Sequence, residues 1–551
     1  MFSHFVHLFG KIRLSLKLCI CLLIFLTYRQ ALSGYFLSDD LDYLYYVAQW
    51  TREGQLIPKL LGELISPQDR GAFFYRPLTI FSYAADYLIW GINPVGWHLT
   101  NLFVHIVSVV LLWLLVEEIV RKLDVQLPRM VLGGAAALLF AIRPSFPETV
   151  VWISGRTDEL ALLGMLVSFV SYLRANGQWG RWYLLSMGGF LFALAGKEVG
   201  VTLPGGLMAL HVAGVIASKP KSGEPNWMAW VRPVVKGVGP FALVLMGYFG
   251  LRFLIFGTPF KVYQVVSPIN LIDPAWLVPK LFALRIFLTQ SLNMGFLAYC
   301  FLLATASLLL LSCFAAWCFS AARRVWVFGI CWLIAELLPL AQQLLIAPTG
   351  EGMRLFYVPS AALAVLMAVS IMPLFLSKEM QWRKIGGSYL SVVAVLFLVG
   401  LVFLSYPLQR QWLKPWLLAG QSMEKLPASI AARAEKLGEN GFAILLIPDH
   451  IGGALFGRNG QGTLMEPPVQ AKLLGDRILV VTPDTLSQHG PRLASSTQKG
   501  LKMEYWCWNV SFLRFEQLAV RQHTTDDWFE AWKSALRDSG YPELADELVN
   551  L

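Results

Sequence analysis

The chain has 551 residues, of which 56% are hydrophobic and only 15% are charged, and its mean hydropathy is +0.56. These values are typical of a protein that crosses a membrane several times. The formal net charge of +10 requires no nucleic-acid partner. Lys and Arg residues that flank the cytoplasmic ends of membrane spans and face anionic lipid account for much of it.

Hydrophobic runs near the roughly 20 residues that a helix needs to cross a bilayer recur along the first 406 residues. Eleven spans can be drawn, of which the third to the fifth are short: 15–33, 97–118, 130–142, 159–174, 182–195, 199–217, 237–256, 292–316, 325–346, 355–376 and 386–406. We therefore predict a multi-pass α-helical membrane protein of about 11 transmembrane helices.

Basic residues cluster before the first span and between alternate pairs of spans. The clusters are Lys11/Arg13/Lys17, Arg121/Lys122/Arg129, Arg174/Arg181, Lys219/Lys221/Arg232/Lys236, Arg323/Arg324 and Lys378/Arg383/Lys384. By the positive-inside rule these clusters are cytoplasmic. The odd number of spans then puts the C-terminus on the opposite, outer side.

The composition changes after the last span, from about Tyr406 onward. We predict strands at 442–447, 478–481 and 505–515, and helices at 429–437 and 525–538, because the first segments are short and apolar and the second carry start and stop signals. The chain is therefore divided into a transmembrane domain, 1–406, and an extracytoplasmic α+β domain, 407–551. No motif falls in the second domain, so we expect it to serve the acceptor or assembly, with Pro448-Asp449-His450 as a candidate contact segment.

Polar segments scattered over more than 300 positions fall at the outer ends of the spans. They are Ser38 to Asp42, Tyr75-Arg76-Pro77, His98 to Asn101 with His105, Arg143-Pro144 with Glu148, Gly155 to Asp158, Gly196-Lys197-Glu198, and Glu351 with Arg354. Polar residues are costly at membrane depth unless they line a protein interior or an aqueous cavity. Their gathering on one side indicates an active site at a membrane face.

Each segment alone also has a plain structural interpretation. The three acids near Asp39 could simply solvate a loop. Arg156 could pair locally with Asp158, and Lys197 could neutralise its neighbour Glu198. Against this, His98, Asn101 and His105 follow spacings of three and four, which place them on one face of a helix as a polar seam.

Taken in order, the motifs resemble those of the transmembrane and tetratricopeptide-repeat O-mannosyltransferases and their bacterial relatives, within the GT-C glycosyltransferases. The matching motifs, spread over about residues 30–380, are Asp39-Asp40, Tyr75-Arg76-Pro77-Leu78-Thr79, His98 with Asn101 and His105, Arg143-Pro144 with Pro147-Glu148 and Val150, Gly155-Arg156 with Asp158, Lys197-Glu198 with Gly200, and Arg354 to Ser360. Two features depart from the family pattern. Arg143 stands where the family often has His, and the repeats are replaced by the small α+β domain, which puts a protein acceptor in doubt.

The resemblance implies a GT-C fold and a donor that is a sugar on a polyprenyl phosphate, held beside the bilayer. It implies an inverting transfer to an acceptor hydroxyl on a glycan, lipid or protein, with Asp39 as general base and Asp40 positioning the acceptor or sharing that role. Candidates for the donor phosphate are Arg156, Lys197 and Arg354, and candidates for the sugar are His98, Asn101, Glu148 and Asp158; Arg76, His105 and Glu198 complete the donor-binding set. No metal ligands are assigned and no cofactor is implied, although a divalent metal remains an alternative.

Two other functional classes fit the same composition. A transporter or flippase of lipid-linked sugars would also need buried charges and many spans, but transporters commonly show repeated halves, and no repeat is visible. The other class is an inactive relative whose outer domain binds glycans. For the enzyme we expect a bacterial inner membrane, with the active site facing the periplasm or the cell exterior.

Overall fold

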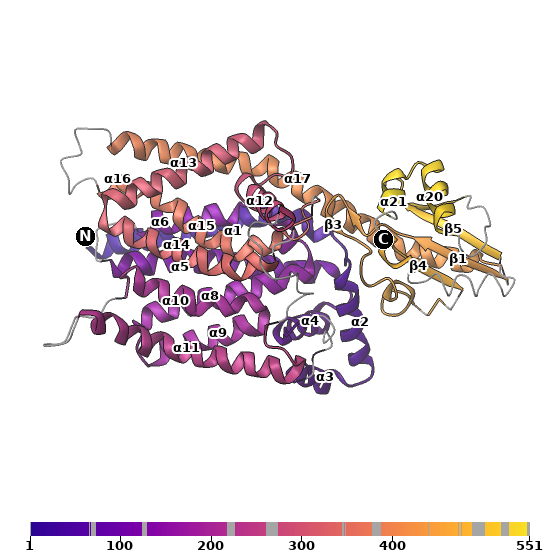
Figure 1. Ribbon diagram of the computed structural model, residues 1–551, viewed down its shortest axis with the longest axis horizontal. Coiled ribbons are helices and arrows are strands. Elements are labelled where there is room, and N and C mark those ends of the chain that lie inside the picture. The colour runs from indigo at the N-terminus through magenta and orange to yellow at the C-terminus, as the bar shows by residue number, and fades with distance from the viewer. Residues whose placement is uncertain are drawn as a thin grey trace.

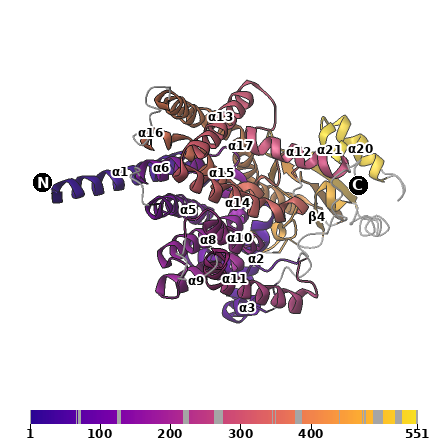
Figure 2. The same cartoon turned by 60° about the vertical axis from the view of Figure 1, so that its left-hand side comes forward.

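The structure is a computed structural model of the chain. It describes residues 2–65, 67, 73–123, 129–216, 226–260, 274–343, 346–347, 349–376, 387–438, 440–471, 473–474, 477–486, 502–518 and 528–547. Figure 1 shows a bundle of long helices that contains the N-terminus, with a small domain of strands and short helices at the opposite end. The turned view in Figure 2 shows the same separation of the N-terminus and the C-terminal domain.

The long helices of the bundle coincide with the predicted spans. They are α1 (Phe2–Tyr28), α5 (Pro94–Lys122), α6 (Arg129–Ala141), α8 (Arg156–Ala175), α9 (Arg181–Gly196), α10 (Leu203–Val212), α11 (Asn226–Phe256), α13 (Phe296–Cys318), α14 (Ser320–Gln343), α15 (Tyr357–Ala368) with α16 (Pro373–Leu376), and α17 (Gly387–Lys436). Each of the eleven predicted spans overlaps one of these helices or, for 355–376, the α15–α16 run. The predicted class, a multi-pass helical membrane protein with a small C-terminal α+β domain, is confirmed.

Length and hydropathy alone make six helical segments of the described chain long and apolar enough to cross a membrane. The other predicted spans correspond to helices that are shorter or carry charges, such as α6, of 13 residues, and α8, which starts with Arg156, Asp158 and Glu159. Such helices need the neighbouring helices to cover their polar groups. The basic residues Lys219, Lys221, Lys378, Arg383 and Lys384 lie outside the described residues.

The described part of the long segment between the first two predicted spans contains helices that the hydropathy pattern does not reveal. These are α2 (Asp39–Arg52), α3 (Leu56–Glu63) and α4 (Pro77–Trp90). In α4, Pro77 occupies the first helical turn, where its missing N–H costs no hydrogen bond. A further helix outside the predicted spans, α12 (Pro274–Thr289), precedes α13.

The C-terminal domain contains a four-stranded sheet of order β4-β1-β5-β6. Its strands are β1 (Gly441–Leu446), β4 (Ile478–Val481), β5 (Lys502–Asn509) and β6 (Arg514–Gln517); β2 (His450–Ile451) and β3 (Ala454–Leu455) form a separate hairpin, and the short helices are α18 (Pro483–Leu486), α20 (Trp528–Asp538) and α21 (Pro542–Glu547). β1 pairs in parallel with β4 and β5, whereas β5 and β6 are antiparallel. Trp532 and Leu536 of α20 pack on the buried face of the sheet.

Two of the predicted elements in this domain differ from the structure. The single strand predicted at 505–515 is a hairpin, because the Asn509 side chain accepts the backbone N–H groups of Ser511 and Phe512 and starts a turn. The separate helix predicted at 429–437 is the end of α17, a helix of 50 residues that runs across residue 406 into the C-terminal domain. The predicted helix start at Thr525, Asp526 and Asp527 lies outside the described residues.

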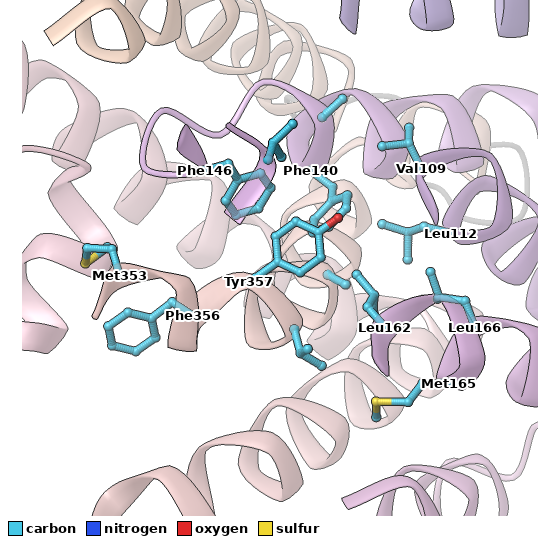
Figure 3. Close-up of a cluster of buried hydrophobic side chains, with 14 of the residues drawn as sticks. Val109, Leu112, Phe140, Phe146, Leu162, Met165, Leu166, Met353, Phe356 and Tyr357 are labelled. Carbon is cyan, nitrogen blue, oxygen red and sulfur yellow. The ribbon is translucent and has the colours of Figure 1, made fainter. Parts of the chain in front are cut away.

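The core of the bundle joins distant segments around Tyr357. Figure 3 shows its ring beside those of Phe140 and Phe146; the ring centroids are 5.2 and 4.8 Å away. His105 donates to or accepts from the Tyr357 hydroxyl over 2.8 Å. The seam predicted on α5 thus ends in an aromatic core.

Helices α8 and α9 approach each other so closely that only glycine fits at the crossing. A Cβ atom on Gly164 would lie 2.7 Å from the Gly189 carbonyl oxygen, and one on Gly189 would lie 2.8 Å from that of Gly164. Small residues allow this backbone contact between helices in a membrane. The crossing matters for the site because α8 begins with Arg156 and α9 ends next to Lys197.

We expect Gly189→Val to destabilise the bundle because its side chain has no space against α8. Overpacking of this kind costs about 1–3 kcal/mol or more, so the apparent melting temperature in detergent should fall. Gly188→Val is the matched control, since it changes the same helix by the same side chain and a Cβ there meets nothing within 4 Å. Equal melting temperatures for the two variants would contradict this packing.

Candidate active site

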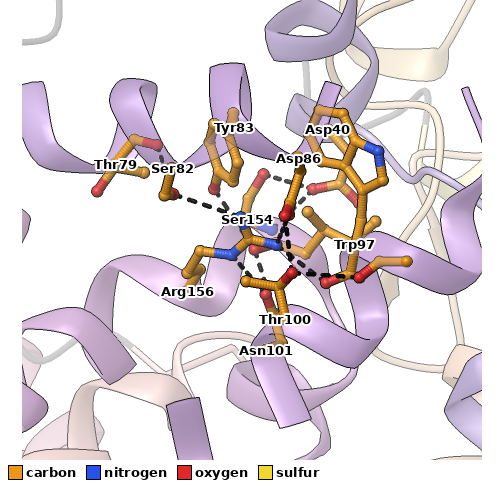
Figure 4. Close-up of polar contacts among 12 residues, drawn as sticks. Asp40, Thr79, Ser82, Tyr83, Asp86, Trp97, Thr100, Asn101, Ser154 and Arg156 are labelled. Carbon is orange, nitrogen blue, oxygen red and sulfur yellow. Dashed lines mark hydrogen bonds and ion pairs between the residues drawn. The ribbon is translucent and has the colours of Figure 1, made fainter. Parts of the chain in front are cut away.

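The motif segments meet at the end of the bundle that carries the C-terminal domain. Figure 4 shows how α2, α4, α5 and the start of α8 bring their polar side chains together. Arg174 lies at the other end of α8, a helix that extends about 30 Å. It pairs there with Glu118 of α5 over 2.9 Å. The structure therefore gathers the sequence-predicted residues at one end of the bundle.

The two adjacent acids have different surroundings. Asp40 is buried, and its carboxylate accepts the backbone N–H groups of Leu37 (3.0 Å) and Ser154 (2.8 Å) as well as the Ser154 hydroxyl. Burial raises the pKa of Asp40 to about 7 against these hydrogen bonds. A pKa near neutrality suits a base, but both oxygens are occupied inside the protein. Asp39 is only half-buried and is the acid of the two that a substrate can reach.

Arg156 is fully buried and held by four acceptors. It forms an ion pair with Asp86 (2.5 Å) and donates to Asn101 (2.6 Å), the Trp97 carbonyl (2.9 Å) and Ser82 (3.3 Å). The local pair with Asp158 that the sequence allowed is therefore wrong. Asn101 in turn donates to the Trp152 carbonyl over 3.0 Å. This arrangement fixes α4, α5 and α8 relative to one another.

Lys197 and Glu198 do not neutralise each other. Lys197 pairs with Asp158 over 2.5 Å, and Glu198 accepts three hydrogen bonds from Arg76, the shortest at 2.8 Å. Burial alone would raise the pKa of Glu198, but Arg76, with Arg252 nearby, holds it below its ordinary value. Each of the two adjacent residues thus connects the end of α9 to a different motif.

Glu148 connects the loop before α8 to the motif before α15. It accepts the backbone N–H groups of Gly352 (2.9 Å) and Arg354 (3.0 Å) and the Arg354 guanidinium (3.1 Å). The same guanidinium lies 4.8 Å from the centre of the Trp152 ring. Arg354 is therefore held between an acid and an aromatic ring, with 19% of its side chain exposed.

The polar seam on α5 is inside the protein. His105 contacts Tyr357, as described above, and His98 is buried against Gly34, where an added Cβ atom would lie 2.9 Å from the His98 Nε2 atom. The described residues contain no group of three His, Cys, Asp or Glu side chains placed to hold a metal ion.

A cavity of about 430 Å³ lies between the bundle and the C-terminal domain. Its volume is in the range of small-ligand sites. Its wall is formed by Glu148, the segment before α13, the Thr349–Gly350 turn, one face of α17 and the β2–β3 turn. The lining side chains include Trp412, Trp416, Asn293, Gln411 and Ser291. Aromatic rings beside amide and hydroxyl groups are suited to bind a sugar, which has apolar faces and polar edges.

Trp152 connects this cavity to the acidic loop. Its ring packs on that of Trp416 with centroids 6.0 Å apart, and its indole N–H donates to the Leu37 carbonyl over 3.2 Å. The cavity wall and the turn that carries Asp39 are therefore one indole ring apart.

Sequence reasoning missed several residues that shape the site. Asp86, Ser82 and Ser154 are isolated polar residues without a motif, and nothing in their spacing reveals that they face Arg156 or Asp40. The segment Gly457-Arg458-Asn459-Gly460-Gln461-Gly462 does carry a signal, since it combines three glycines with polar side chains directly after an apolar hairpin.

No family model matches the chain. Among curated proteins, "Protein O-mannosyl-transferase Tmtc1" of Drosophila melanogaster is 34% identical over 130 residues, which are 23% of this chain and 14% of that protein. "Protein O-mannosyl-transferase TMTC3" of Homo sapiens is 34% identical over 143 residues, 25% of this chain and 15% of the relative. The chain is similar in sequence to the protein O-mannosyl-transferases. This confirms the resemblance drawn from the motifs.

A longer and weaker match extends the similarity over most of the bundle. "Protein O-mannosyl-transferase TMTC1" of Homo sapiens is 25% identical over 412 residues, 64% of this chain and 44% of the relative. The chain thus spans less than half the length of these relatives. Among solved structures, ArnT from Cupriavidus metallidurans bound to undecaprenyl phosphate covers 91% of this chain and 94% of its own at 12% identity and a TM-score of 0.46.

Glu351 connects the bundle to the C-terminal domain through two side chains. It accepts from His450 over 2.9 Å and from Arg458 over 2.6 Å. Burial would lower the pKa of His450, but the hydrogen bond and the charge of Glu351 raise it. Burial would raise the pKa of Glu351, but His450 and the charge of Arg458 hold it below its ordinary value.

The docking of the two domains should therefore be strongest between the ordinary pKa values of Glu, about 4.3, and His, about 6.5. The His450 contribution is lost as the pH rises through its raised folded-state pKa, and the Glu351 contribution is lost as the pH falls through its lowered one. We expect the melting temperature to fall by roughly 1–3 °C between pH 6 and pH 8.5 through this pair. His450→Gln should remove that part of the pH dependence, and an unchanged profile in the variant would refute the assignment.

Proposed function

We propose that the chain is a membrane glycosyltransferase that moves a sugar from a polyprenyl-phosphate donor to an acceptor hydroxyl at the outer membrane face. The observation that carries the proposal is the placement of Asp39, the half-buried acid, one indole ring away from an aromatic and amide-lined cavity at the end of the bundle. The similarity to O-mannosyl-transferases supports the same reaction class.

In the proposed reaction, the Asp39 carboxylate takes the proton of the acceptor hydroxyl as the oxygen attacks the anomeric carbon. The bond between that carbon and the phosphate oxygen breaks, and polyprenyl phosphate leaves with the electron pair. Because the attack is direct, the anomeric configuration is inverted. A phosphate is already a good leaving group, so no separate general acid is needed.

The charge that develops on the departing phosphate needs a cation nearby. Arg156 is enclosed by its own acceptors and best serves to hold the helices together. Arg354 is the better candidate, because 19% of its side chain remains exposed, and Lys197, which pairs with Asp158, is the second. Arg354 lies next to the cavity, because its partner Glu148 is part of the wall.

The orientation in the membrane follows from the same arrangement. We propose that the N-terminus is cytoplasmic and that the C-terminal domain lies in the periplasm or outside the cell, because Arg121, Lys122 and Arg174 gather at the opposite end from the motifs. Reporter fusions at Asn176 and Gly540 should report opposite sides, the first cytoplasmic. Two cytoplasmic signals would overturn the orientation.

The experiment that tests the function is a search for the unused donor. Deletion of the gene should cause one polyprenyl-phosphate sugar to accumulate, and mass spectrometry of the lipid extract would name the sugar. The purified protein in nanodiscs should then release polyprenyl phosphate from that lipid; undecaprenyl-phosphate mannose is the first to try, given the names of the relatives. If no such lipid accumulates and the purified protein releases no polyprenyl phosphate, the proposed function is wrong.

We expect Asp39→Asn to reduce turnover of this donor by roughly 10²–10⁴-fold, the usual effect of losing a general base, with little change in KM. Arg354→Ala should weaken donor binding as well as turnover. Asp40→Asn is expected to lower the melting temperature, because the buried carboxylate holds Ser154 and Leu37. An Asp39→Asn variant that folds and keeps normal turnover would place the base elsewhere.

A further inference from the structure

A loop of the C-terminal domain, Phe456–Thr463, lies directly on the turn that carries Asp39. We call it the covering loop. The Phe456 carbonyl accepts the backbone N–H of Ser38 over 3.0 Å, and the Thr463 hydroxyl donates to Asp42 over 3.3 Å. Between these two contacts, the Asn459 side-chain amide donates to Oδ1 of Asp39. Three successive contacts thus join segments more than 400 residues apart.

The covering loop also holds a strained backbone in place. Ser38 has φ 50° and ψ −120°, a conformation that costs a residue with a side chain about 1–3 kcal/mol. Its N–H is bound by Phe456, and Gly460 lies against its carbonyl. A Cβ atom on Gly460 would come within 2.8 Å of the Leu41 Cβ and 2.9 Å of the Ser38 oxygen. The conformation that presents Asp39 therefore depends on contact with the second domain.

The position of Asn459 is fixed by its neighbours rather than by burial of its own side chain. Arg458 is paired with Glu351, and the Gln461 side chain donates to the Gly457 and Arg458 carbonyls over 2.6 and 2.8 Å. Asn459 itself is exposed, yet its amide points at Asp39. An exposed amide held this way contributes little to stability and is available for a role in the site.

The hydrogen bonds that Asp39 receives from the described residues both fall on one oxygen. The Asn459 amide and the Ser38 hydroxyl, at 3.4 Å, both donate to Oδ1. A carboxylate held through one oxygen keeps a fixed plane and presents the other, Oδ2, in a fixed direction. This is what a base needs in order to meet an incoming hydroxyl at hydrogen-bond distance.

We infer that the covering loop is part of the active site and that Asn459 is a positioning residue, which orients the Asp39 carboxylate so that Oδ2 faces the acceptor. This inference rests on the proposed function, in which Asp39 is the base. It gives the C-terminal domain a part in the chemical step, beyond the role in acceptor binding or assembly expected from its lack of motifs.

The test compares full-length variants in nanodiscs, with turnover of the polyprenyl-phosphate sugar that the deletion strain accumulates. Asn459→Ala should lower kcat by about 10–100-fold, as misplacement of a catalytic group does, and leave KM for the donor unchanged. Asn459→Asp, which keeps the shape but puts two carboxylates side by side, should lose at least as much. Asn440→Ala is the control, because Asn440 is exposed in the same domain and its backbone carbonyl, rather than its side chain, accepts the Lys502 N–H.

A double-mutant cycle separates positioning from a general structural effect. In the Asp39→Asn background, Asn459→Ala should cause no further loss beyond about twofold, because the group that it orients is already gone. Equal melting temperatures for wild type, Asn459→Ala and Asn440→Ala are expected.

Three outcomes would overturn the inference. Normal kcat in both Asn459 variants, with Asp39→Asn inactive, would refute it and leave the proposed function intact. Additive losses in the double variant would assign Asn459 a structural role only. Normal turnover in Asp39→Asn would remove both the proposed base and the inference that depends on it, a pattern distinct from the first.

Discussion

Charged groups in a membrane protein must be paired before they can be placed near the bilayer, and in this chain the pairs also hold the site together. Four such pairs each join two segments that are far apart in sequence. They are Asp86 with Arg156, Asp158 with Lys197, Glu198 with Arg76, and Glu148 with Arg354. Removing one partner would leave a buried charge uncompensated, which is far more costly than losing an exposed pair. The same pairs set the positions of α4, α8, α9 and the turn before α15.

The sequence predicts the spans well because hydrophobic length is a local property. Each predicted span overlaps a helix, and β4 has the predicted bounds at Ile478–Val481. The short helices between the first two spans are not visible in this way, since α2 begins with three acids and is too short and too polar to stand out as a span. The β5–β6 hairpin depends on one side chain, Asn509, that reads equally well as part of a strand.

The gathering of the motif residues at one end of the bundle was also predictable, but the partners that they bind were not. Motif order indicated which residues belong together, whereas the partners follow from how four helices cross. Lys197 and Glu198 illustrate the limit: adjacent opposite charges suggest a local pair, yet the chain between α9 and α10 directs them to Asp158 and Arg76. Asp86 and Asn459 belong to no motif, so only the fold reveals that they contact Arg156 and Asp39.

Arg143, where the resembled family often has His, has a structural consequence at the cavity. Its guanidinium donates to the Phe287 carbonyl and lies 4.4 Å from the centre of the Phe287 ring. Nearby, the Gln290 side chain accepts the Ser145 N–H over 3.1 Å, and the Gln290 carbonyl accepts the Trp412 indole N–H over 2.9 Å. The end of α12 is thereby tied both to the loop that carries Glu148 and to α17.

The segment that follows these bonds, from Ser291 onward, forms one wall of the cavity, and Trp412 forms another. A neutral imidazole could accept or donate one hydrogen bond here, but it could not both stack as a cation on Phe287 and reach its carbonyl with a planar fork of donors. Arg143, the residue that departs from the resembled pattern, therefore contacts the helix that leads into this wall of the cavity. Arg143 and the C-terminal domain, the two departures from the resembled pattern, thus meet at this cavity, whereas three of the four charge pairs that hold the bundle are formed entirely by residues of the matching motifs.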